Sequence, residues 1–268
     1  MKDNPAGLEV LSHAPPAKSR KHKTPLLFIH GAYTAAWCWA EYFLPFFAAQ
    51  GYVSYALSLS GHGASRGRRH LDSFGINDYI NDVAEVVAGL PAPPVLIGHS
   101  MGGFVVQKYL EKHQAPAAVL MCAAPPQGLM SAAFGLMFQK PGLMSDLNSV
   151  MSGGRVSVET LRQALFAQPI AAEDLQRYLR LSQSESHRAI WDMTLFNLPQ
   201  PSRVNNTPLL VLGGELDQLI PATLVEMTAR TYSVEAELFP GMGHGLMLEA
   251  DWRIVAGRIQ AWLKEKGI

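Results

Sequence analysis

The sequence is poor in cysteine, has no excess of charge of either sign and lacks a long apolar run, and each absence excludes a class of protein. Its only cysteines, Cys38 and Cys122, are far apart among 268 residues, so their spacing indicates neither a disulfide framework nor a metal site. Lysine plus arginine and aspartate plus glutamate both number 22, and this balance does not favour a nucleic-acid partner. We therefore expect a reduced protein that does not bind nucleic acid.

Apolar residues make up 48% of the chain, which is enough for a substantial core. No apolar run reaches the roughly 18 residues that a membrane helix needs, and residues 1 to 23 contain no stretch typical of a signal peptide. We therefore expect a cytoplasmic protein that is not stably inserted into a membrane.

Short apolar runs of strand length alternate with stretches of helical pattern. Several of these runs are apolar throughout, which is typical of parallel strands covered on both faces. The expected strands lie at residues 25 to 30, 52 to 59, 94 to 98, 117 to 124, 208 to 214 and 235 to 239. The expected helices lie near residues 39 to 50, 76 to 89, 100 to 113, 221 to 231 and 249 to 265. This alternation predicts an α/β fold with a mostly parallel, doubly wound sheet.

Residues 125 to 204 interrupt the alternation, because they contain several helical patterns and no convincing strand. We interpret them as a helical cap, or lid, inserted into a core domain of residues 1 to 124 and 205 to 268. Methionines recur there every seven residues, but Pro141 and Gly142 argue against one continuous helix. They either fill the core of the cap or line an adaptable apolar pocket. These methionines are Met130, Met137, Met144 and Met151.

The stretch Gly98-His99-Ser100-Met101-Gly102 sets a serine between two glycines where an expected strand meets an expected helix. It matches G-x-S-x-G, a sharp turn that lifts the serine hydroxyl off the sheet and leaves no room for a β-carbon at either glycine. The N–H groups that begin the following helix favour negative charge beside the hydroxyl. Ser100 is therefore a candidate nucleophile.

A serine hydroxyl is a weak nucleophile until a base removes its proton, so we expect a histidine oriented by a carboxylate elsewhere in the chain. Asp217 follows the expected strand at 208 to 214, and His244 follows the last expected strand. Both would lie at the carboxyl edge of the sheet, where open α/β sheets bind ligands. Glu215 is the nearest rival to Asp217.

Together these motifs resemble those of serine hydrolases of the α/β-hydrolase fold, such as esterases, lipases and lysophospholipases, over residues 24 to 268. The resemblance implies that Ser100, Asp217 and His244 are the nucleophile, the acid and the base. It also implies an oxyanion hole made by two backbone N–H groups. These belong to Met101 and to Ala32, which lies in the stretch FIHGAYTAAWCW.

Three further residues would support this site. Gly31 permits the turn before Ala32, His30 braces the same loop by hydrogen bonding, and His99 is better interpreted as a structural group than as a proton carrier. The chain departs from the family at Ser58, near His62, where an aspartate is common.

Neighbouring basic residues allow two interpretations. Arg66, Arg68 and Arg69 form a solvated surface, or they approach an acidic substrate if their loop borders the cleft. The sequence has no nucleotide-binding motif and no cluster of metal ligands, so we expect neither a cofactor nor a metal.

The expected function is a cofactor-independent serine hydrolase that cleaves carboxylic esters through an acyl-enzyme intermediate. Its partner would be a small-molecule ester with an apolar acyl or alcohol part. The alternatives are a thioesterase or carbon–carbon-bond hydrolase with the same triad, or a weakly catalytic ligand-binding protein of this fold. The natural substrate, its acyl length, the oligomeric state and any movement of the cap stay open at this level.

Overall fold

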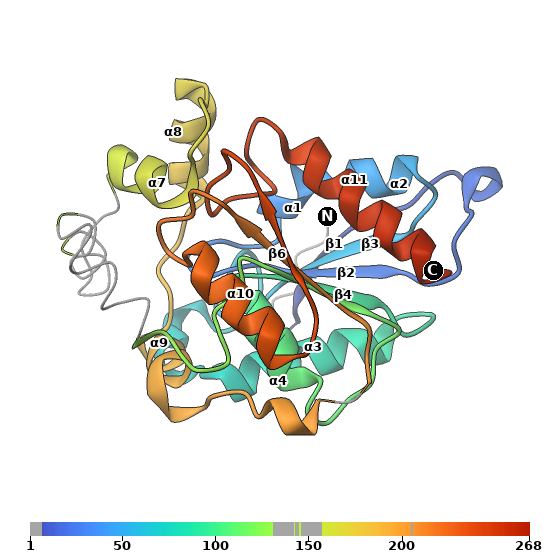
Figure 1. Ribbon diagram of the computed structural model, residues 1–268, viewed down its shortest axis with the longest axis horizontal. Coiled ribbons are helices and arrows are strands. Elements are labelled where there is room, and N and C mark those ends of the chain that lie inside the picture. Colours follow the sequence, from blue (N-terminus) through green and yellow to red (C-terminus); the bar gives the residue numbers. More distant parts are fainter. Residues whose placement is uncertain (1–6, 131–141, 143–144, 146–156, 205) are drawn as a thin grey trace.

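A single twisted sheet of seven strands forms the centre of the computed structural model, which describes residues 7–130, 142, 145, 157–204 and 206–268 (Figure 1). The strand order is β1-β3-β2-β4-β5-β6-β7, and all neighbours are parallel except β1 and β3. The predicted α/β fold with a mostly parallel sheet is thus confirmed. The strands are β1 (Glu9–His13), β2 (Leu26–Ile29), β3 (Ser54–Ser58), β4 (Val95–His99), β5 (Ala118–Met121), β6 (Leu209–Gly214) and β7 (Ala236–Phe239).

The central strands are covered on both faces, as their continuous apolar runs predict. Every residue of β2, β4 and β5 is buried. Because side chains alternate along a strand, Leu26 and Phe28 join one core cluster while Leu27 and Ile29 join the other. The sheet therefore separates two hydrophobic cores.

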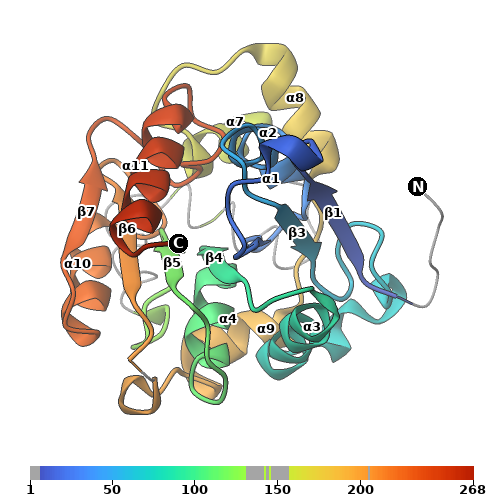
Figure 2. The same cartoon turned by 90° about the vertical axis from the view of Figure 1, so that its right-hand side faces the viewer.

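Helices cover both faces of the sheet (Figure 2). One core includes residues of α1, α2 and α11, and the other includes residues of α3, α4 and α10. The bounds of these helices are α1 (Trp37–Ala40), α2 (Phe43–Ala49), α3 (Ile76–Gly89), α4 (Met101–Tyr109), α10 (Ala222–Thr231) and α11 (Trp252–Glu265).

The predicted helix at 39 to 50 is in fact two helices. α1 and α2 are separated at Tyr42, whose φ of −132° and ψ of −42° depart from helical values. Pro45 lies in the first turn of α2, where its missing N–H breaks no intrahelical hydrogen bond. The break falls at Glu41 and Tyr42, between two apolar stretches that a single helical pattern can span.

The first strand was not predicted. β1 lies at the sheet edge antiparallel to β3, and its side chains are only partly buried or exposed. It brings the Glu9 carboxylate to Ser58, whose Oγ donates a hydrogen bond of 2.6 Å to Glu9 Oε2. Ser58 Oγ in turn accepts the backbone N–H of Ala36 at 3.0 Å. Glu9 therefore supplies a carboxylate beside Ser58, the position at which the resemblance leads us to expect an aspartate.

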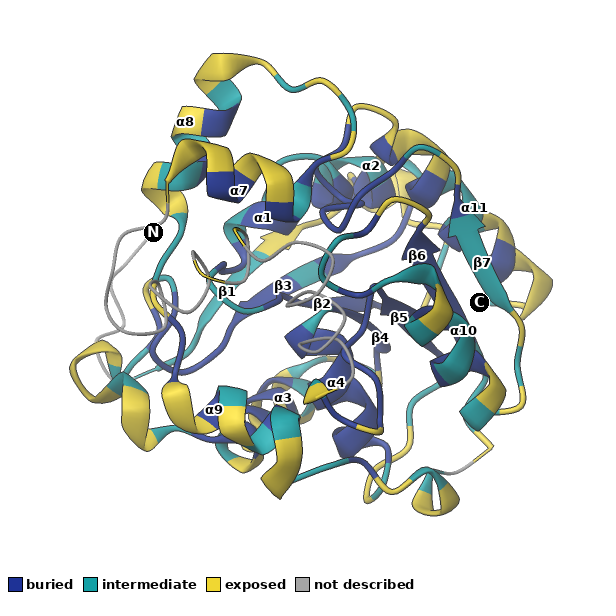
Figure 3. Cartoon of the chain, turned by 60° about the vertical axis from the view of Figure 1, so that its left-hand side comes forward, coloured by how far each residue is buried: buried dark blue, intermediate teal, exposed yellow. Residues whose placement is uncertain are grey.

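The interval between β5 and β6 contains helices and no strand among the described residues. α7 (Val158–Leu165) and α8 (Ala172–Leu181) pack on each other, and their outer surfaces are exposed (Figure 3). α9 (His187–Trp191) continues into a π-helical turn at Asp192–Phe196. The division into a core and a cap at 125–204 stays a prediction.

Met137, Met144 and Met151 lie outside the described residues, and Met130 is exposed. Within the described part of the chain, no helix is long and apolar enough to cross a membrane.

Candidate active site

Ser100 occupies a strained turn between β4 and α4. Its φ of 52° and ψ of −117° are rare for a residue with a side chain, and such strain often accompanies function. A β-carbon at Gly98 would collide with the carbonyl of Gly102, and one at Gly102 would collide with the carbonyl of Ile29. Both glycines are therefore required by the close approach of the backbone.

The loop after β2 packs directly against this turn. A β-carbon at Gly31 would lie 3.0 Å from the Cβ of Ser100, so the following residue, Ala32, is brought beside the hydroxyl. Among the described residues, neither the N–H of Ala32 nor that of Met101 has a hydrogen-bond acceptor. Two unpaired N–H groups are thus available next to Ser100.

Asp217 and His244 form a hydrogen-bonded pair at the same edge of the sheet. Nδ1 of His244 lies 2.7 Å from Oδ2 of Asp217, and both side chains are buried. Asp217 Oδ1 accepts the N–H groups of Leu219 and Ile220 at 2.8 and 2.9 Å. A carboxylate held in this way fixes the imidazole tautomer, with the proton on Nδ1 and a lone pair on Nε2.

Glu215, the rival to Asp217, is not part of this pair. Its side chain is exposed and accepts the N–H of Gly241 at 3.0 Å. The carboxylate that meets the histidine is therefore that of Asp217.

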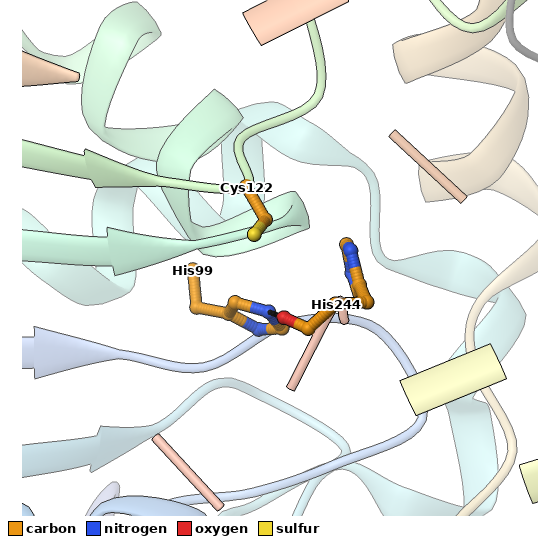
Figure 4. Close-up of side chains that lie close together, drawn as sticks. All are labelled: His99, Cys122 and His244. Carbon is orange, nitrogen blue, oxygen red and sulfur yellow. Dashed lines mark hydrogen bonds between the residues drawn. The ribbon is translucent and has the colours of Figure 1, made fainter. Parts of the chain in front are cut away.

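His99 links the serine turn to the histidine loop (Figure 4). Its Nε2 donates a hydrogen bond of 2.9 Å to the backbone carbonyl of His244, and the two rings lie 4.6 Å apart between centroids. Within the described chain, Ser100 Oγ and His244 are not hydrogen bonded. The turn of Ser100 and the pair of His244 and Asp217 are thus joined through His99 at one edge of the sheet. The hydrogen bond between the serine hydroxyl and the histidine is not formed in this structure.

Two neighbouring histidines are held neutral. Because a carbonyl can only accept, His99 Nε2 carries the proton, and burial lowers the pKa of His99 well below its ordinary value. Nδ1 of His30 donates to the carbonyl of Gly31 at 2.8 Å, while Nε2 accepts the N–H of Leu59 at 3.0 Å. Burial, together with the nearby His62, lowers the pKa of His30 to about 3. Neither ring competes with His244 for a proton near neutral pH.

Cys122 lies just after β5, beside the same residues. Its thiol and one nitrogen each of His99 and His244 all lie within 4.8 Å of one another (Figure 4). Burial, and then the Asp217 carboxylate, raise the pKa of Cys122 well above its ordinary value. A metal would need a thiolate at this position, and burial together with the Asp217 carboxylate disfavours the charged form of Cys122. We therefore assign these three groups to the candidate active site and not to a metal centre.

Glu249 is a part of the site that the sequence analysis missed. Its Oε1 accepts the N–H groups of Gly243 and Ala167 at 2.7 and 2.8 Å, and its Oε2 accepts that of Gln168 at 3.2 Å. The buried carboxylate thereby ties the loop of His244 to the end of α7. The available signal was a lone acidic residue in the otherwise apolar run that follows His244.

Comparisons with known proteins agree with the fold. A family model described as the alpha/beta hydrolase family matches residues 26–258. The chain is 24% identical to a monoacylglycerol lipase from Mycolicibacterium smegmatis, and the match covers 81% of this chain and 80% of the lipase. It is 29% identical to a non-heme haloperoxidase from Rhodococcus erythropolis, over 83% of this chain and 86% of that protein.

A solved structure of an esterase from Exiguobacterium antarcticum has the same fold. The TM-score is 0.74 at 20% sequence identity, over 96% of this chain and 95% of the esterase. At this level of identity the likeness concerns the fold alone.

Proposed function

Since the chain belongs to the alpha/beta hydrolase family, we propose that it is a serine hydrolase that cleaves carboxylic esters. The observation that carries this proposal is the hydrogen bond of 2.7 Å between His244 and Asp217, formed beside the strained turn of Ser100. The relative named as a monoacylglycerol lipase supports the same reaction class.

In the proposed mechanism, Ser100 Oγ attacks the ester carbonyl while His244 Nε2 takes its proton. The histidine then gives that proton to the leaving alcohol, and an acyl group remains on the serine. Water, deprotonated by the same nitrogen, attacks this acyl-enzyme, and the nitrogen returns the proton to Ser100 Oγ as the acid leaves. Asp217 holds the imidazole and stabilises its positive charge throughout.

The tetrahedral intermediates carry negative charge on the former carbonyl oxygen. The N–H groups of Ala32 and Met101 are the proposed donors to that oxygen, and one such donor contributes about 3 to 4 kcal/mol. Catalytic hydrogen bonds are often long before substrate binds, so Ser100 and His244 are expected to approach each other in the complex.

The proposal is tested with a fluorophosphonate probe and a series of p-nitrophenyl esters of increasing acyl length. We expect the probe to label Ser100, and both labelling and hydrolysis to be lost in Ser100→Ala. Ser19→Ala, at an exposed serine in the N-terminal region, is the matched control and should keep both. The absence of labelling and turnover in a folded wild-type protein would refute esterase activity and favour the ligand-binding alternative.

The same experiment separates the other candidates. Thioesters and carbon–carbon substrates assayed beside the oxygen esters show which bond is cleaved fastest. The relative named as a non-heme haloperoxidase favours a second candidate, halide-dependent peroxidation. Bromination of an organic acceptor in the presence of hydrogen peroxide, compared in wild type and Ser100→Ala, tests it directly.

A further inference from the structure

A cavity of about 520 Å³ lies beside the loop that contains Ala32, and its volume suits a small molecule. Three segments form its walls. Tyr33 comes from that loop, residues 68–73 form a 3-10 helical segment after β3, and residues 184–187 connect α8 to α9. Both acidic and basic side chains line the cavity. Which arginines can meet an anion therefore depends on the partner of each carboxylate.

The carboxylate of Glu185 faces His62 and not an arginine. Its Oε1 accepts the hydroxyl of Tyr79 at 2.7 Å and the N–H of Ser186 at 2.8 Å, and its Oε2 lies 3.0 Å from Nε2 of His62. Nδ1 of His62 donates to the carbonyl of Ser60 at 3.1 Å. Although burial opposes it, the facing carboxylate raises the pKa of His62.

The second carboxylate of the cavity is also engaged. Asp72 Oδ1 accepts the backbone N–H of His187 at 2.9 Å and faces its Nδ1 at 2.8 Å. Both carboxylates of the wall therefore face histidines, and neither forms an ion pair with an arginine among the described residues.

The arginines of the cavity lack carboxylate partners among the described residues. Nη1 of Arg68 donates to the carbonyls of Gly61 and Ser184 at 3.0 and 3.1 Å, which orient the guanidinium without cancelling its charge. Arg69 is exposed and forms no hydrogen bond or ion pair with any described residue. Arg66, by contrast, is paired with Glu85 and does not line the cavity. Two guanidinium groups without a carboxylate partner among the described residues thus lie at the cavity.

The wall is continuous with the proposed oxyanion loop. Tyr33 directly follows Ala32 and has a left-handed φ of 63°. Its carbonyl accepts the N–H of Gln183 at 2.8 Å, which joins the loop to the segment that follows α8. A molecule in the cavity therefore lies close to the candidate active site.

We propose that this cavity binds the carboxylate or phosphate group of the substrate, so that the protein prefers esters that carry a negative charge. Arginine suits this role because its planar guanidinium can form two parallel hydrogen bonds to either oxyanion. Binding of the anion follows from the cavity alone, whereas the preference among esters rests on the proposed function.

The binding arm of the test is calorimetric titration of the intact protein with inorganic phosphate and, separately, with glutarate at low ionic strength. We expect saturable binding of at least one, weakened roughly tenfold in Arg69→Gln because a charge-assisted hydrogen bond is lost. Arg20→Gln, an exposed arginine distant in sequence, is the control and should bind as wild type does. Binding that is absent, or equal in Arg69→Gln and wild type, overturns the proposal.

The activity arm compares matched charged and neutral esters. One pair is the mono-p-nitrophenyl ester of adipic acid and p-nitrophenyl hexanoate, and the other is the butyrate ester of 3-hydroxypropyl phosphate and propyl butyrate. We expect a roughly tenfold higher kcat/KM for the charged member of at least one pair, through KM, and loss of this preference in Arg69→Gln. Arg20→Gln, which changes an arginine outside the cavity, should leave the kcat/KM of all four esters unchanged.

The two arms fail separately. Hydrolysis of neutral esters without anion binding would overturn the anion site and leave the proposed function standing. Anion binding without hydrolysis of any ester would leave the cavity as a binding site and refute the proposed function.

Discussion

The carboxylate of Glu249 accepts the backbone N–H of Gly243 at 2.7 Å, immediately before His244 in the chain. The same carboxylate accepts two N–H groups at the end of α7, and Gly245 donates its own N–H to the carbonyl of Leu165 at 2.7 Å. The backbone on both sides of His244 is thus attached to the region of the predicted cap. We infer that Glu249 positions the histidine without touching the substrate.

Replacing Glu249 should therefore affect turnover more than substrate binding. Glu249→Ala leaves three N–H groups without their acceptor, and each buried unsatisfied group costs about 1–3 kcal/mol. We expect kcat to fall with little change in KM, and Glu249→Gln to be milder because its amide oxygen still accepts. Steady-state kinetics and melting temperature measure this, with the exposed Glu235→Gln as control. An unchanged kcat in Glu249→Ala would contradict the inferred role.

The two candidate acids can be separated by parallel substitutions. Asp217→Asn should lower kcat by about 10⁴-fold, because an asparagine does not hold the imidazole of His244 in the tautomer whose Nε2 can take a proton. Glu215→Gln should retain nearly full activity, since its side chain is exposed and bonds only the backbone of Gly241. Ester hydrolysis by purified variants of equal melting temperature provides the comparison. A large loss in Glu215→Gln would exchange the roles of these residues.

Two glycines should respond to the same substitution in opposite ways. Gly102→Ala places a β-carbon against the carbonyl of Ile29, so we expect a large loss of stability and of activity. Gly257 lies within α11 with no atom within 4 Å of its would-be β-carbon. Gly257→Ala should therefore stabilise the fold by about 0.5–1 kcal/mol, the usual helix-propensity difference. Urea unfolding at one pH measures both effects.

The buried pair of His62 and Glu185 should make stability depend on pH. Although burial opposes it, the Glu185 carboxylate raises the pKa of His62, so this contribution is complete below the ordinary value of 6.5 and is lost as the pH rises through the folded-state pKa. Although burial again opposes it, His62 lowers the pKa of Glu185. That contribution is complete above the ordinary value of 4.5 and is lost as the pH falls through the folded-state pKa.

The pair should thus stabilise the fold most between pH 4.5 and 6.5. The double variant His62→Gln with Glu185→Gln should lose most stability near about pH 5.5, and the difference from wild type should shrink toward about pH 9. Urea unfolding across this range tests the expectation. A difference that is constant with pH would show that the pair is not ionised.

The sequence predicted the parts of the fold that have strong local patterns. Continuous apolar runs located β2, β4 and β5, and G-x-S-x-G located the turn of Ser100 between a strand and a helix. β1 was not predicted because an edge strand of five residues, with polar side chains toward solvent, has no comparable apolar run. The break between α1 and α2 was not predicted because one polar residue, Glu41, between two apolar stretches also fits the exposed side of a single helix.

The supporting contacts of the site could not be predicted for a different reason. Glu249 accepts backbone N–H groups more than 80 positions away, and Glu185 meets His62 across a still longer span of chain. Nearly every residue has a backbone N–H, so the sequence does not show which residue donates that group to a distant carboxylate. The catalytic roles of Ser100, Asp217 and His244 stay predictions until activity is measured.

The hydrogen bond between Glu9 and Ser58 connects the edge strand β1 to the loop of Ala32, because the same Ser58 hydroxyl accepts the N–H of Ala36 in that loop. A chain shortened to begin at residue 14 would lose more than a peripheral strand. The backbone of β3 would be opened to pairing with other chains, a common route to aggregation, and the hydroxyl of Ser58 would lose its charged acceptor beneath Ala36.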